Sequence, residues 1–351
     1  MYHTQYNFMQ NMKNILVTGG AGFIGSHTVV ELRNAGYQPI IIDDFSNSDP
    51  SILSGIEAIL QEKLIVYKGS CLDERFLSTV FSSHAISGVI HFAAFKSVSE
   101  SIEKPLLYWE NNIYSLLSVL RASLIHNVRA FVFSSSATVY GEPDRLPLLE
   151  TDPRKPATCA YGATKQAGED MVQNACLSSS TSLKGISLRY FNPIGAHPSG
   201  RIGELPLGPP QNLVPFLTQT VFGLRDELTV FGNDYPTPDG TCQRDYIHVI
   251  DLAQAHICAL ARLFKETSPH YDVFNIGNGK AISVLDVIQT FENVTHKKVP
   301  YHIGPRRNGD VVSCYAKVTK ANKLLGWKAK KSLEQALKDA WNWQGQLKKL
   351  L

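Results

Sequence analysis

The sequence predicts an α/β protein, namely a Rossmann-type doubly wound parallel sheet followed by a smaller α/β C-terminal substrate domain. Short apolar runs alternate with longer amphipathic stretches in the first half of the chain, which is typical of βαβ units. From Asn192 onward, Pro and Gly become dense and the segments become shorter and less regular. The length of 351 residues also favours two domains, because a single core rarely grows beyond ~300 residues.

The apolar runs of the first half define the expected strands. They are residues 14–18, 39–43, 64–67, 89–92, 131–135 and 186–190. Residues 251–264 are apolar at helical spacing, so the segment 245–264 could pack back onto the first domain. We expect residues 1–12 to form a disordered extension, residues 13–190 the first domain and residues 191–351 the second.

Composition excludes several classes of partner. The net charge is +3, with no basic block, which argues against nucleic acid or a membrane surface. The six cysteines lie far apart and form no C-x-x-C pair, so we expect neither a disulfide framework nor a metal site. The sequence has no signal peptide and no apolar run of ~20 residues, which predicts a cytoplasmic protein that does not cross a membrane.

A glycine-rich turn follows the first expected strand. Residues 19–25 read Gly-Gly-Ala-Gly-Phe-Ile-Gly and open a helix, where a pyrophosphate can rest on the helix N-terminus. Asp43 ends the second strand, where its carboxylate can accept hydrogen bonds from ribose hydroxyls and would repel a 2′-phosphate. A glycine-rich turn with a solvated acid is the simpler alternative, but the ordered combination favours NAD. The expected contacts in the turn are Gly19, Gly22, Phe23, Ile24 and Gly25.

Candidate catalytic residues lie on the second half of this predicted domain. Tyr161 and Lys165 are four residues apart at the start of a helical run, so they share one helix face. We expect the ammonium to lower the pKa of the phenol toward the working pH, as a general base requires. Lys165 could also hold the nicotinamide ribose. Ser136 and Thr138 follow an apolar strand, and Ser136 can bind the reacting oxygen. By itself, a Y-x-x-x-K pair is more often a feature of a surface helix.

Three of these motifs together resemble the extended short-chain dehydrogenase/reductase superfamily: residues 19–25, the run Ser-Ser-Ser-Ala-Thr-Val-Tyr-Gly at 134–141, and Y-x-x-x-K at 161–165. Within it, the chain is similar to the UDP-glucose 4-epimerases from residue 12 to residue 343, including the runs 91–96, 189–193, 195–200 and 244–249. The resemblance implies that Tyr161 takes the proton of the sugar 4-hydroxyl while hydride passes to NAD. A 4-keto sugar then turns over and receives the hydride on its opposite face.

The resemblance also implies roles for further residues. The cofactor side comprises Asp43, Asp44, Asn47, Ser48, Ser70, Phe92, Ala93, Lys96, Asn111, Tyr161, Lys165 and Tyr190. The substrate side comprises Lys96, Ser136, Tyr161, Tyr190, Asn192, Asn212, Leu213, Phe231, Arg244, Arg307, Asp310 and Cys314. Ser70 departs from the family, which usually has an aspartate there for the adenine amino group. In the family that the chain resembles, a tyrosine at the position of Cys314 accompanies restriction to the plain hexoses. Cys314 is small, so UDP-GlcNAc and UDP-GalNAc are expected substrates too. The alternative is that Cys314 is a buried apolar thiol, which is the commoner fate of a lone cysteine.

Two alternatives remain open. A sister enzyme, such as a 4,6-dehydratase or a decarboxylase, would begin with the same oxidation, but those relatives typically carry acidic residues where Ala137 and Thr138 stand. A non-catalytic NAD-binding module could use the same fold. The resemblance further implies a homodimer that forms through helices including the one with Tyr161.

Overall fold

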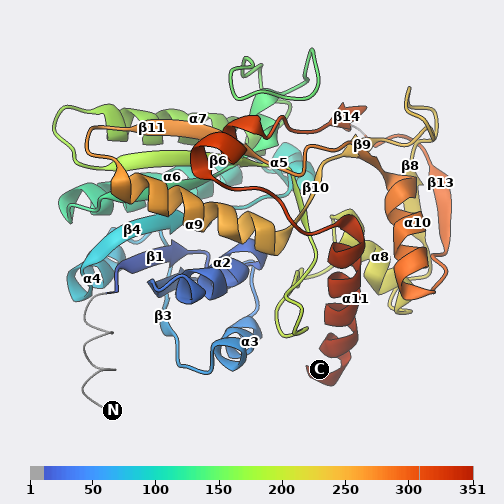
Figure 1. The fold of residues 1–351 in the computed structure, drawn as a ribbon, viewed down its shortest axis with the longest axis horizontal. Coiled ribbons are helices and arrows are strands. Elements are labelled where there is room, and N and C mark those ends of the chain that lie inside the picture. The colour runs from blue at the N-terminus through green and yellow to red at the C-terminus, as the bar shows by residue number, and fades with distance from the viewer. Residues whose placement is uncertain (1–11, 308, 351) are drawn as a thin grey trace.

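The computed structural model describes residues 12–307 and 309–350. The expectation for residues 1–12 therefore lies outside the described residues, except for Met12. In the described part, seven strands form one parallel sheet in the order β11-β6-β5-β4-β1-β2-β3 (Figure 1). Their bounds are β1 Asn14–Thr18, β2 Gln38–Asp43, β3 Ile65–Lys68, β4 Ile86–His91, β5 Ala130–Ser136, β6 Lys184–Tyr190 and β11 Tyr271–Ile276.

Six of these strands were predicted from the sequence, and the α/β Rossmann-type fold class is confirmed. The seventh, β11, was not predicted. Its sequence, Tyr-Asp-Val-Phe-Asn-Ile, mixes polar and apolar residues, and it pairs with β6 at the edge of the sheet. An edge strand needs less continuous apolar sequence than a strand buried between two neighbours, so its signal is weaker.

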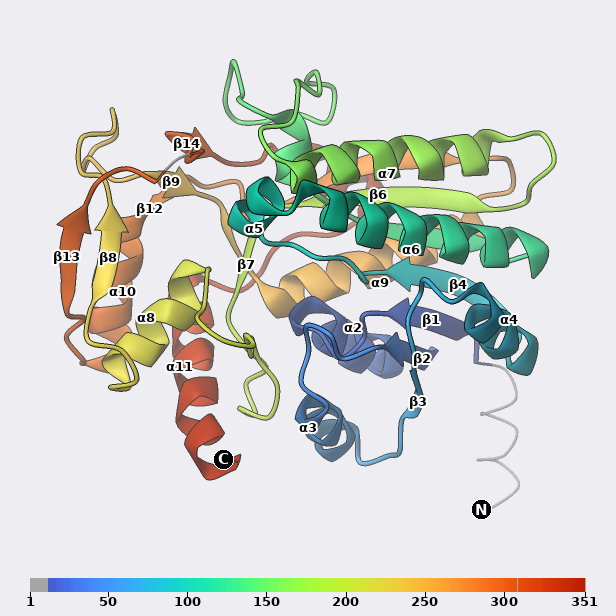
Figure 2. The same cartoon turned by 180° about the vertical axis from the view of Figure 1, so that it is seen from behind.

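Helices cover both faces of the sheet (Figures 1 and 2). On one face lie α2 Phe23–Asn34, α3 Ser51–Leu60 and α9 Val249–Lys265, whose apolar side chains share one core with the strands. On the other lie α4 Glu74–Ser83, α6 Pro105–Ile125 and α7 Ala160–Leu177, with the short α5 Val98–Glu103 beside α6 and α7. The sheet is thus buried on both faces, as its apolar strands require.

In its described residues, the smaller lobe contains three small sheets and three helices. The strands are β7 Asn192–Ile194 with β10 Tyr246–His248, β9 Gln243–Arg244 with β12 Ile282–Ser283 and β14 Ser313–Cys314, and β8 Leu228–Phe231 with β13 Tyr301–Gly304. The helices are α8 Leu213–Val221, α10 Val284–Thr295 and α11 Leu333–Leu350, which surround a core of their own. Short helical segments, η1 Ala137–Tyr140 and η2 Ala321–Leu325, complete the described elements.

Two segments beyond residue 190 belong to the large lobe. Strand β11 extends the parallel sheet, and α9 packs along α2. Asp251 in the first turn of α9 accepts hydrogen bonds from the backbone N–H groups of Lys330 and Lys331, at 3.0 and 2.8 Å. The chain therefore passes between the lobes several times, and chain order alone does not separate them.

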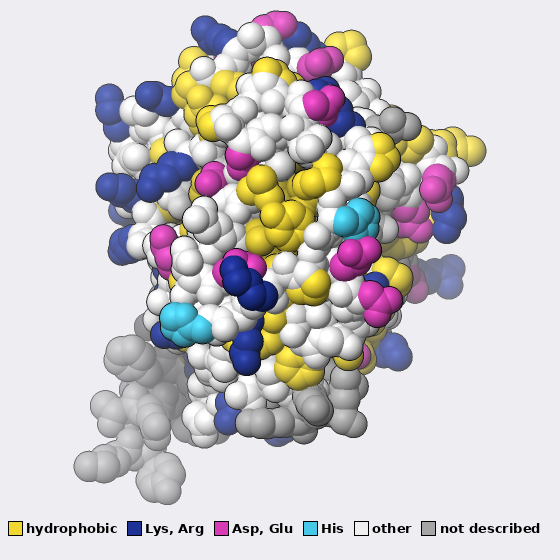
Figure 3. Space-filling model, turned by 90° about the vertical axis from the view of Figure 1, so that its right-hand side faces the viewer, with side chains coloured by type: hydrophobic (Ala, Val, Ile, Leu, Met, Phe, Trp, Pro, Cys, Tyr) yellow, Lys and Arg dark blue, Asp and Glu magenta, His cyan; other side chains and the backbone are white. Residues whose placement is uncertain are grey.

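The surface at the end of the smaller lobe is partly apolar. Figure 3 shows hydrophobic side chains gathered near the middle of the face that carries β8, β13 and α10, with charged side chains around them. Exposed hydrophobic residues on these two strands are Phe231, Tyr301 and Ile303.

Among the described residues, the helices are all too short or too polar to span a membrane.

Candidate active site

The glycine-rich turn that joins β1 to α2 leaves no room for side chains at two of its glycines. Gly19 has a φ of +70°, and a Cβ there would lie 2.9 Å from the backbone nitrogen of Ala93. A Cβ on Gly25 would lie 2.2 Å from the carbonyl oxygen of Gly19. Helix α2 begins at Phe23, and Gly22 at its N-cap position provides no side-chain cap. The helix N-terminus is therefore left for an external anion.

Asp43 is the last residue of β2, and its carboxylate lies beside this turn. One oxygen accepts a hydrogen bond from the N–H of Ala21 at 2.9 Å. The other accepts hydrogen bonds from the Ser48 hydroxyl at 2.8 Å and the N–H of Phe45 at 3.0 Å. Asp43 thus connects the glycine turn to the segment with Asp44, Asn47 and Ser48. The predicted cofactor residues of both segments meet at one edge of the sheet.

The other predicted cofactor residues lie along the neighbouring strand ends. Ser70 follows β3, where its hydroxyl accepts a hydrogen bond from the N–H of Leu72 at 3.2 Å. Phe92 and Ala93 follow β4, and the N–H of Phe92 donates to the carbonyl of Thr18 at 3.0 Å. Asn111 lies on α6 and donates to the side-chain oxygen of Asn112 at 3.0 Å.

Ser136, Tyr161 and Lys165 come together at the end of β5. Helix α7 begins at Ala160, so Tyr161 lies in its first turn and Lys165 lies one turn later. The Lys165 ammonium donates a hydrogen bond to the carbonyl of Ser134 at 2.6 Å, and lies 5.8 Å from the centre of the Tyr161 ring. A hydrogen bond with the Ser136 hydroxyl favours the ionised form of Tyr161. The three predicted catalytic groups therefore form one cluster.

The pKa of Tyr161 differs from the value that the sequence led us to expect. Burial raises the pKa of Tyr161 to about 12, and the hydrogen bond with Ser136 opposes that shift only in part. Burial also lowers the pKa of Lys165 to about 7, opposed by the carboxylate of Glu169. The expected lowering of the Tyr161 pKa is therefore not seen for the chain's own residues, because desolvation by burial is the largest effect on the phenol.

Thr138 lies on η1, close to the start of α7. Its N–H donates to the Ser136 hydroxyl at 3.2 Å, so Ser136 caps this short helix. Its own hydroxyl is buried and has no hydrogen-bond partner among the described residues. A buried hydroxyl without a partner is costly, which marks Thr138 as a candidate contact for a bound molecule.

Tyr190 is the last residue of β6 and pairs in register with Ser136. Its hydroxyl is hydrogen-bonded to Nε2 of His256, a fully buried residue on α9. The other ring nitrogen of His256 lies 2.8 Å from the carbonyl of Leu252, and burial lowers the pKa of the ring to about 3. The neutral ring therefore donates to Leu252 and accepts from Tyr190. His256 was not predicted from the sequence, where it stands only as a polar residue within an apolar helical stretch.

A second cluster lies on the smaller lobe. Arg244 on β9 donates to Asp310 at 3.1 Å and to the carbonyl of Val311 at 2.8 Å. Arg307 also donates to Asp310, at 2.9 Å, and its guanidinium lies 5.7 Å from the centre of the Phe231 ring. Two guanidinium groups share one carboxylate, which leaves donors for a diphosphate. The predicted substrate residues Arg244, Arg307, Asp310 and Phe231 are thus brought together.

Cys314 and Asn192 lie beside Arg244 and Asp245. Cys314 on β14 pairs in register with Arg244, and burial raises the pKa of its thiol to about 11. A neutral buried thiol is a poor nucleophile, so its volume matters more than its reactivity. Asn192 opens β7, where its N–H donates to the carbonyl of Asp245 at 2.9 Å.

Glu204 connects the two lobes and was not predicted from the sequence. Its carboxylate accepts a hydrogen bond from Asn212 at 2.6 Å and forms an ion pair with Lys96 at 3.2 Å. Asn212 lies at the N-cap of α8, directly before Leu213. Lys96 and Asn212, two predicted contact residues, therefore bind one acid from the Pro- and Gly-rich segment, and Leu213 follows Asn212 directly in the chain.

The site fits a dinucleotide. The glycine turn has no room for a Cβ at positions 19 and 25, and the N-terminus of α2 has no side-chain cap. Asp43, with its carboxylate beside the turn, is the last residue of β2. No group of side chains that could hold a metal is found within residues 12–307 and 309–350. With Ser136, Tyr161 and Lys165 at the same sheet edge, fold and site define a short-chain dehydrogenase/reductase of the extended type.

Comparison with known proteins agrees with this class. A family model described as GDP-mannose 4,6 dehydratase matches residues 16–340. UDP-glucose 4-epimerase of Drosophila melanogaster is 46% identical over 338 residues, which cover 95% of this chain and 96% of that protein.

Two crystal structures are similar throughout. UDP-glucose 4-epimerase from Stenotrophomonas maltophila with bound NAD and formylated UDP-arabinopyranose has a TM-score of 0.93 and 43% identity, covering 97% of this chain and 100% of that one. The enzyme from Bifidobacterium longum in complex with NAD+ and UDP has a TM-score of 0.91 and 43% identity, covering 95% of this chain and 98% of that one. The chain belongs to the family of the UDP-glucose 4-epimerases.

Proposed function

We propose that this protein interconverts UDP-glucose and UDP-galactose by inverting the sugar at C4, with NAD as a resident cofactor. The observation that carries the proposal is the cluster of Ser136, Tyr161 and Lys165 beside the glycine turn, in a chain of this family. When bound, NAD would supply a reversible hydride acceptor for C4, so the reaction is redox-neutral overall. The glycine turn and Asp43 would hold this cofactor.

The chain's own residues would move the proton and orient the sugar. Tyr161 accepts the proton of the 4-hydroxyl and later returns it to the 4-keto oxygen. Ser136, hydrogen-bonded to Tyr161, holds the reacting oxygen, and Thr138 offers a buried hydroxyl beside it. Lys165 holds the nicotinamide ribose, and its positive charge counters the cost of a buried phenolate. Arg244 and Arg307 bind the diphosphate.

The identity of residues 137 and 138 separates this proposal from a dehydratase, although the matching family model is named for one. Elimination needs an acid or base beside the sugar, and Ala137 and Thr138 offer no carboxylate there. This favours return of the hydride to C4. The decisive assay incubates the purified chain with UDP-galactose and no reductant. Formation of UDP-glucose without net NADH supports the epimerase. A dehydrated or decarboxylated product supports a sister enzyme, and binding without conversion supports a non-catalytic NAD-binding module.

We also propose that the protein accepts N-acetylated substrates. Cys314 occupies little volume next to Arg244, and a 2-acetamido group needs space while the keto sugar turns. The expected result is that the protein also interconverts UDP-GlcNAc and UDP-GalNAc, and that Cys314→Tyr abolishes this activity while UDP-galactose is still converted. Both sugar pairs should be assayed with both proteins, and Cys314→Ser serves as the small control. A wild-type protein inactive on UDP-GalNAc, or a tyrosine variant that keeps that activity, contradicts the idea.

Domain roles, assembly and location complete the proposal. Residues 13–190, together with α9 and β11, form the NAD-binding lobe, and the rest of residues 191–351 binds the UDP-sugar. Two copies associate through the outer surface of α5, α6 and α7, where Ile102, Leu106, Trp109 and Tyr114 are exposed hydrophobic residues. The protein works in the cytosol, in keeping with six cysteines that are all free thiols.

A further inference from the structure

Glu169 lies one turn after Lys165 on α7 and is buried, with 2% of its surface exposed. Its Oε1 accepts a hydrogen bond from the Ser135 hydroxyl at 2.6 Å and another from Nε of Arg189 at 2.8 Å. Its Oε2 accepts a bond from Nη2 of Arg189 at 2.7 Å and lies 3.5 Å from Arg154. Burying a carboxylate costs free energy unless charged and polar partners surround it, as they do here. We therefore expect Glu169 to have a role beyond packing.

The partners of Glu169 directly precede active-site residues. Ser135 and Arg189 pair in register on β5 and β6, and the next pair is Ser136 with Tyr190. Ser135 and Arg189 point toward α7, where both bind the Glu169 carboxylate, and they directly precede Ser136 and Tyr190 in the chain. Glu169 thus holds the ends of β5 and β6 on the face of the sheet that α7 covers.

Lys165 and Glu169 fasten consecutive residues of β5 to α7. The Lys165 ammonium binds the carbonyl of Ser134, and the Glu169 carboxylate binds the hydroxyl of Ser135. These two contacts fix the position of α7 along β5. The distance between Ser136 and Tyr161 depends on that position, because one residue ends the strand and the other begins the helix.

Glu169 also places a negative charge near a buried ammonium. The groups that face Lys165 are Tyr161 and Glu169 from α7, His91 from β4 and the Phe133 ring from β5. Burial lowers the pKa of Lys165, and Glu169 is the group that opposes this shift. Facing Glu169 itself are Arg189, Arg154 and Tyr271, with the Tyr140 ring stacked on Arg189.

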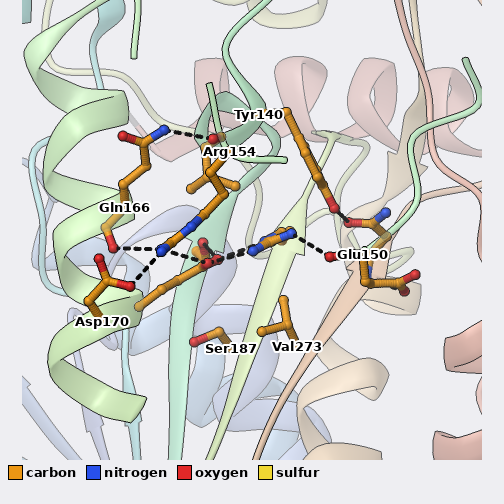
Figure 4. A network of polar contacts seen from close by, with 12 residues as sticks. Tyr140, Glu150, Arg154, Gln166, Asp170, Ser187 and Val273 are labelled. Carbon is orange, nitrogen blue, oxygen red and sulfur yellow. Dashed lines mark hydrogen bonds and ion pairs between the residues drawn. The ribbon is translucent and has the colours of Figure 1, made fainter. Parts of the chain in front are cut away.

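A wider network keeps Glu169 in place. Arg154 donates to Asp170 at 2.6 Å and to the carbonyl of Gln166 at 3.1 Å, and Gln166 donates to the carbonyl of Val139 at 2.8 Å. Figure 4 shows Gln166, Arg154 and Asp170 on one side of this network, with Tyr140 and Glu150 on the other. The network links α7, η1, β5, β6 and β11, so Glu169 is held rigidly.

We propose that Glu169 is a positioning residue for the epimerase reaction: it holds Ser136, Tyr190 and Tyr161 in register through its bonds to Ser135 and Arg189. The inference rests on the proposed function for its catalytic consequence. Removing the charge should lower kcat while the KM for UDP-galactose and the affinity for NAD stay near wild type. It should also move the alkaline limb of the pH profile of kcat to lower pH, because Lys165 then loses its proton earlier.

The test compares four forms of the NAD-loaded protein: wild type, Glu169→Gln, Glu169→Gln with Arg189→Met, and Asp170→Asn. Asp170 is the matched control, because it is the next residue on α7 and pairs with the same Arg154 but is exposed. The double variant removes the unpaired guanidinium that the single variant would leave buried. We expect kcat of Glu169→Gln to fall about 10- to 100-fold, as misplacement of reacting groups implies, with the alkaline limb displaced in both the single and the double variant.

A structural ion pair would behave differently. If the double variant regains the wild-type rate and pH profile, or if Glu169→Gln matches Asp170→Asn, the proposal is overturned. If the single variant does not fold, the double variant and Glu169→Asp carry the test, and Glu169→Asp should keep the wild-type limb because it keeps the charge. Carbon-13 NMR of lysine labelled at Cε, assigned with Lys165→Met, measures the titration of Lys165 directly. A wild type without UDP-galactose turnover refutes the proposed function, whereas an unchanged Lys165 titration in Glu169→Gln refutes this inference.

Discussion

At the scale of single residues, burial drives both members of the Tyr161 and Lys165 pair toward their neutral forms. It raises the pKa of the phenol and lowers the pKa of the ammonium, so neither group is prepared for catalysis by burial alone. Each charged form depends on a specific neighbour: Ser136 for the phenolate and Glu169 for the ammonium. Activity should therefore be sensitive to Glu169, although this residue does not touch the sugar.

Substitution of Tyr161 by Phe removes the phenolic oxygen and keeps the ring, so the fold and NAD binding should persist. Conversion of UDP-galactose should fall by at least ~10²-fold, because a general acid/base group is lost. A coupled assay for UDP-glucose measures the rate, and calorimetry checks NAD binding. Tyr301→Phe, which changes an exposed tyrosine, is the control. A Tyr161→Phe protein with near-normal turnover would show that another group moves the proton.

The sequence indicated the chemically distinctive residues but not their supports. Tyr161, Lys165 and Ser136 belong to recognisable motifs, whereas Glu204 and His256 acquire their partners only through the tertiary fold. Glu204 meets Lys96 from 108 positions away, and His256 meets Tyr190 from 66. Contacts at such separations leave no local pattern. Glu169 did have a local signal, namely its spacing of four residues from Lys165 on one helix face.

At the scale of elements, Asp245 holds the small sheet on which Arg244 and Cys314 lie. One carboxylate oxygen accepts a hydrogen bond from the N–H of Asn278 at 2.6 Å. The other accepts from the N–H groups of Gly279 and Ala316, at 2.9 and 3.0 Å. Asp245 therefore fixes β14 next to β9, which places Cys314 beside Arg244.

Substitution of Asp245 by Asn should destabilise the protein by about 1–3 kcal/mol, because an amide NH2 would face backbone donors in place of an acceptor. Urea unfolding of both proteins measures this difference. The KM for UDP-galactose should rise while the affinity for NAD stays unchanged, since the glycine turn is remote from this sheet. Asp226→Asn, at an exposed position of the same lobe, should alter neither quantity. Equal stability of Asp245→Asn and wild type would mean that these three bonds do not support the sheet.

Strands of the parallel sheet were predictable because two buried faces demand continuous apolar runs. The expected bounds differ from the observed ones by at most three residues; β1 agrees at both ends, and β2 and β6 agree at their C-terminal ends. The short strands of the smaller lobe were not predicted individually. Several, such as β9 and β14, are two residues long, and their pairing depends on Asp245 rather than on their own sequence.

At the scale of the whole molecule, the two lobes share structure across the proposed boundary at residue 190. The parallel sheet takes β11 from the second half of the chain, and α9 contributes buried residues such as Leu252 and Leu260 to the core of the first. The large lobe is therefore completed only after most of the chain has been made. A fragment ending at residue 190 would lack the edge strand β11 and helix α9, so a single boundary in chain order does not separate the lobes.

The last prediction concerns assembly. Leu106, Trp109 and Tyr114 lie exposed on α6, with Leu106 showing 79% of its surface, and Ile102 lies exposed on the adjacent α5. In a symmetric dimer each substitution acts twice, so Leu106→Glu with Tyr114→Glu would place four like charges in the proposed interface. We expect association to weaken by about 100-fold or more, because juxtaposed like charges cost several kcal/mol. Sedimentation velocity should show twice the chain mass for wild type and the chain mass for the variant.

Leu224→Glu provides the control for this experiment, because Leu224 is an exposed leucine of the smaller lobe, away from α5, α6 and α7. It should leave the sedimentation unchanged. The unfolding midpoint of the double variant, measured across protein concentrations, should lose the concentration dependence expected of a dimer. A double variant that sediments as the wild type does would place the interface elsewhere, and a wild type with the mass of one chain would exclude the dimer. Since α7 carries Tyr161, Lys165 and Glu169, loss of the interface should also lower kcat, because the partner would no longer brace that helix.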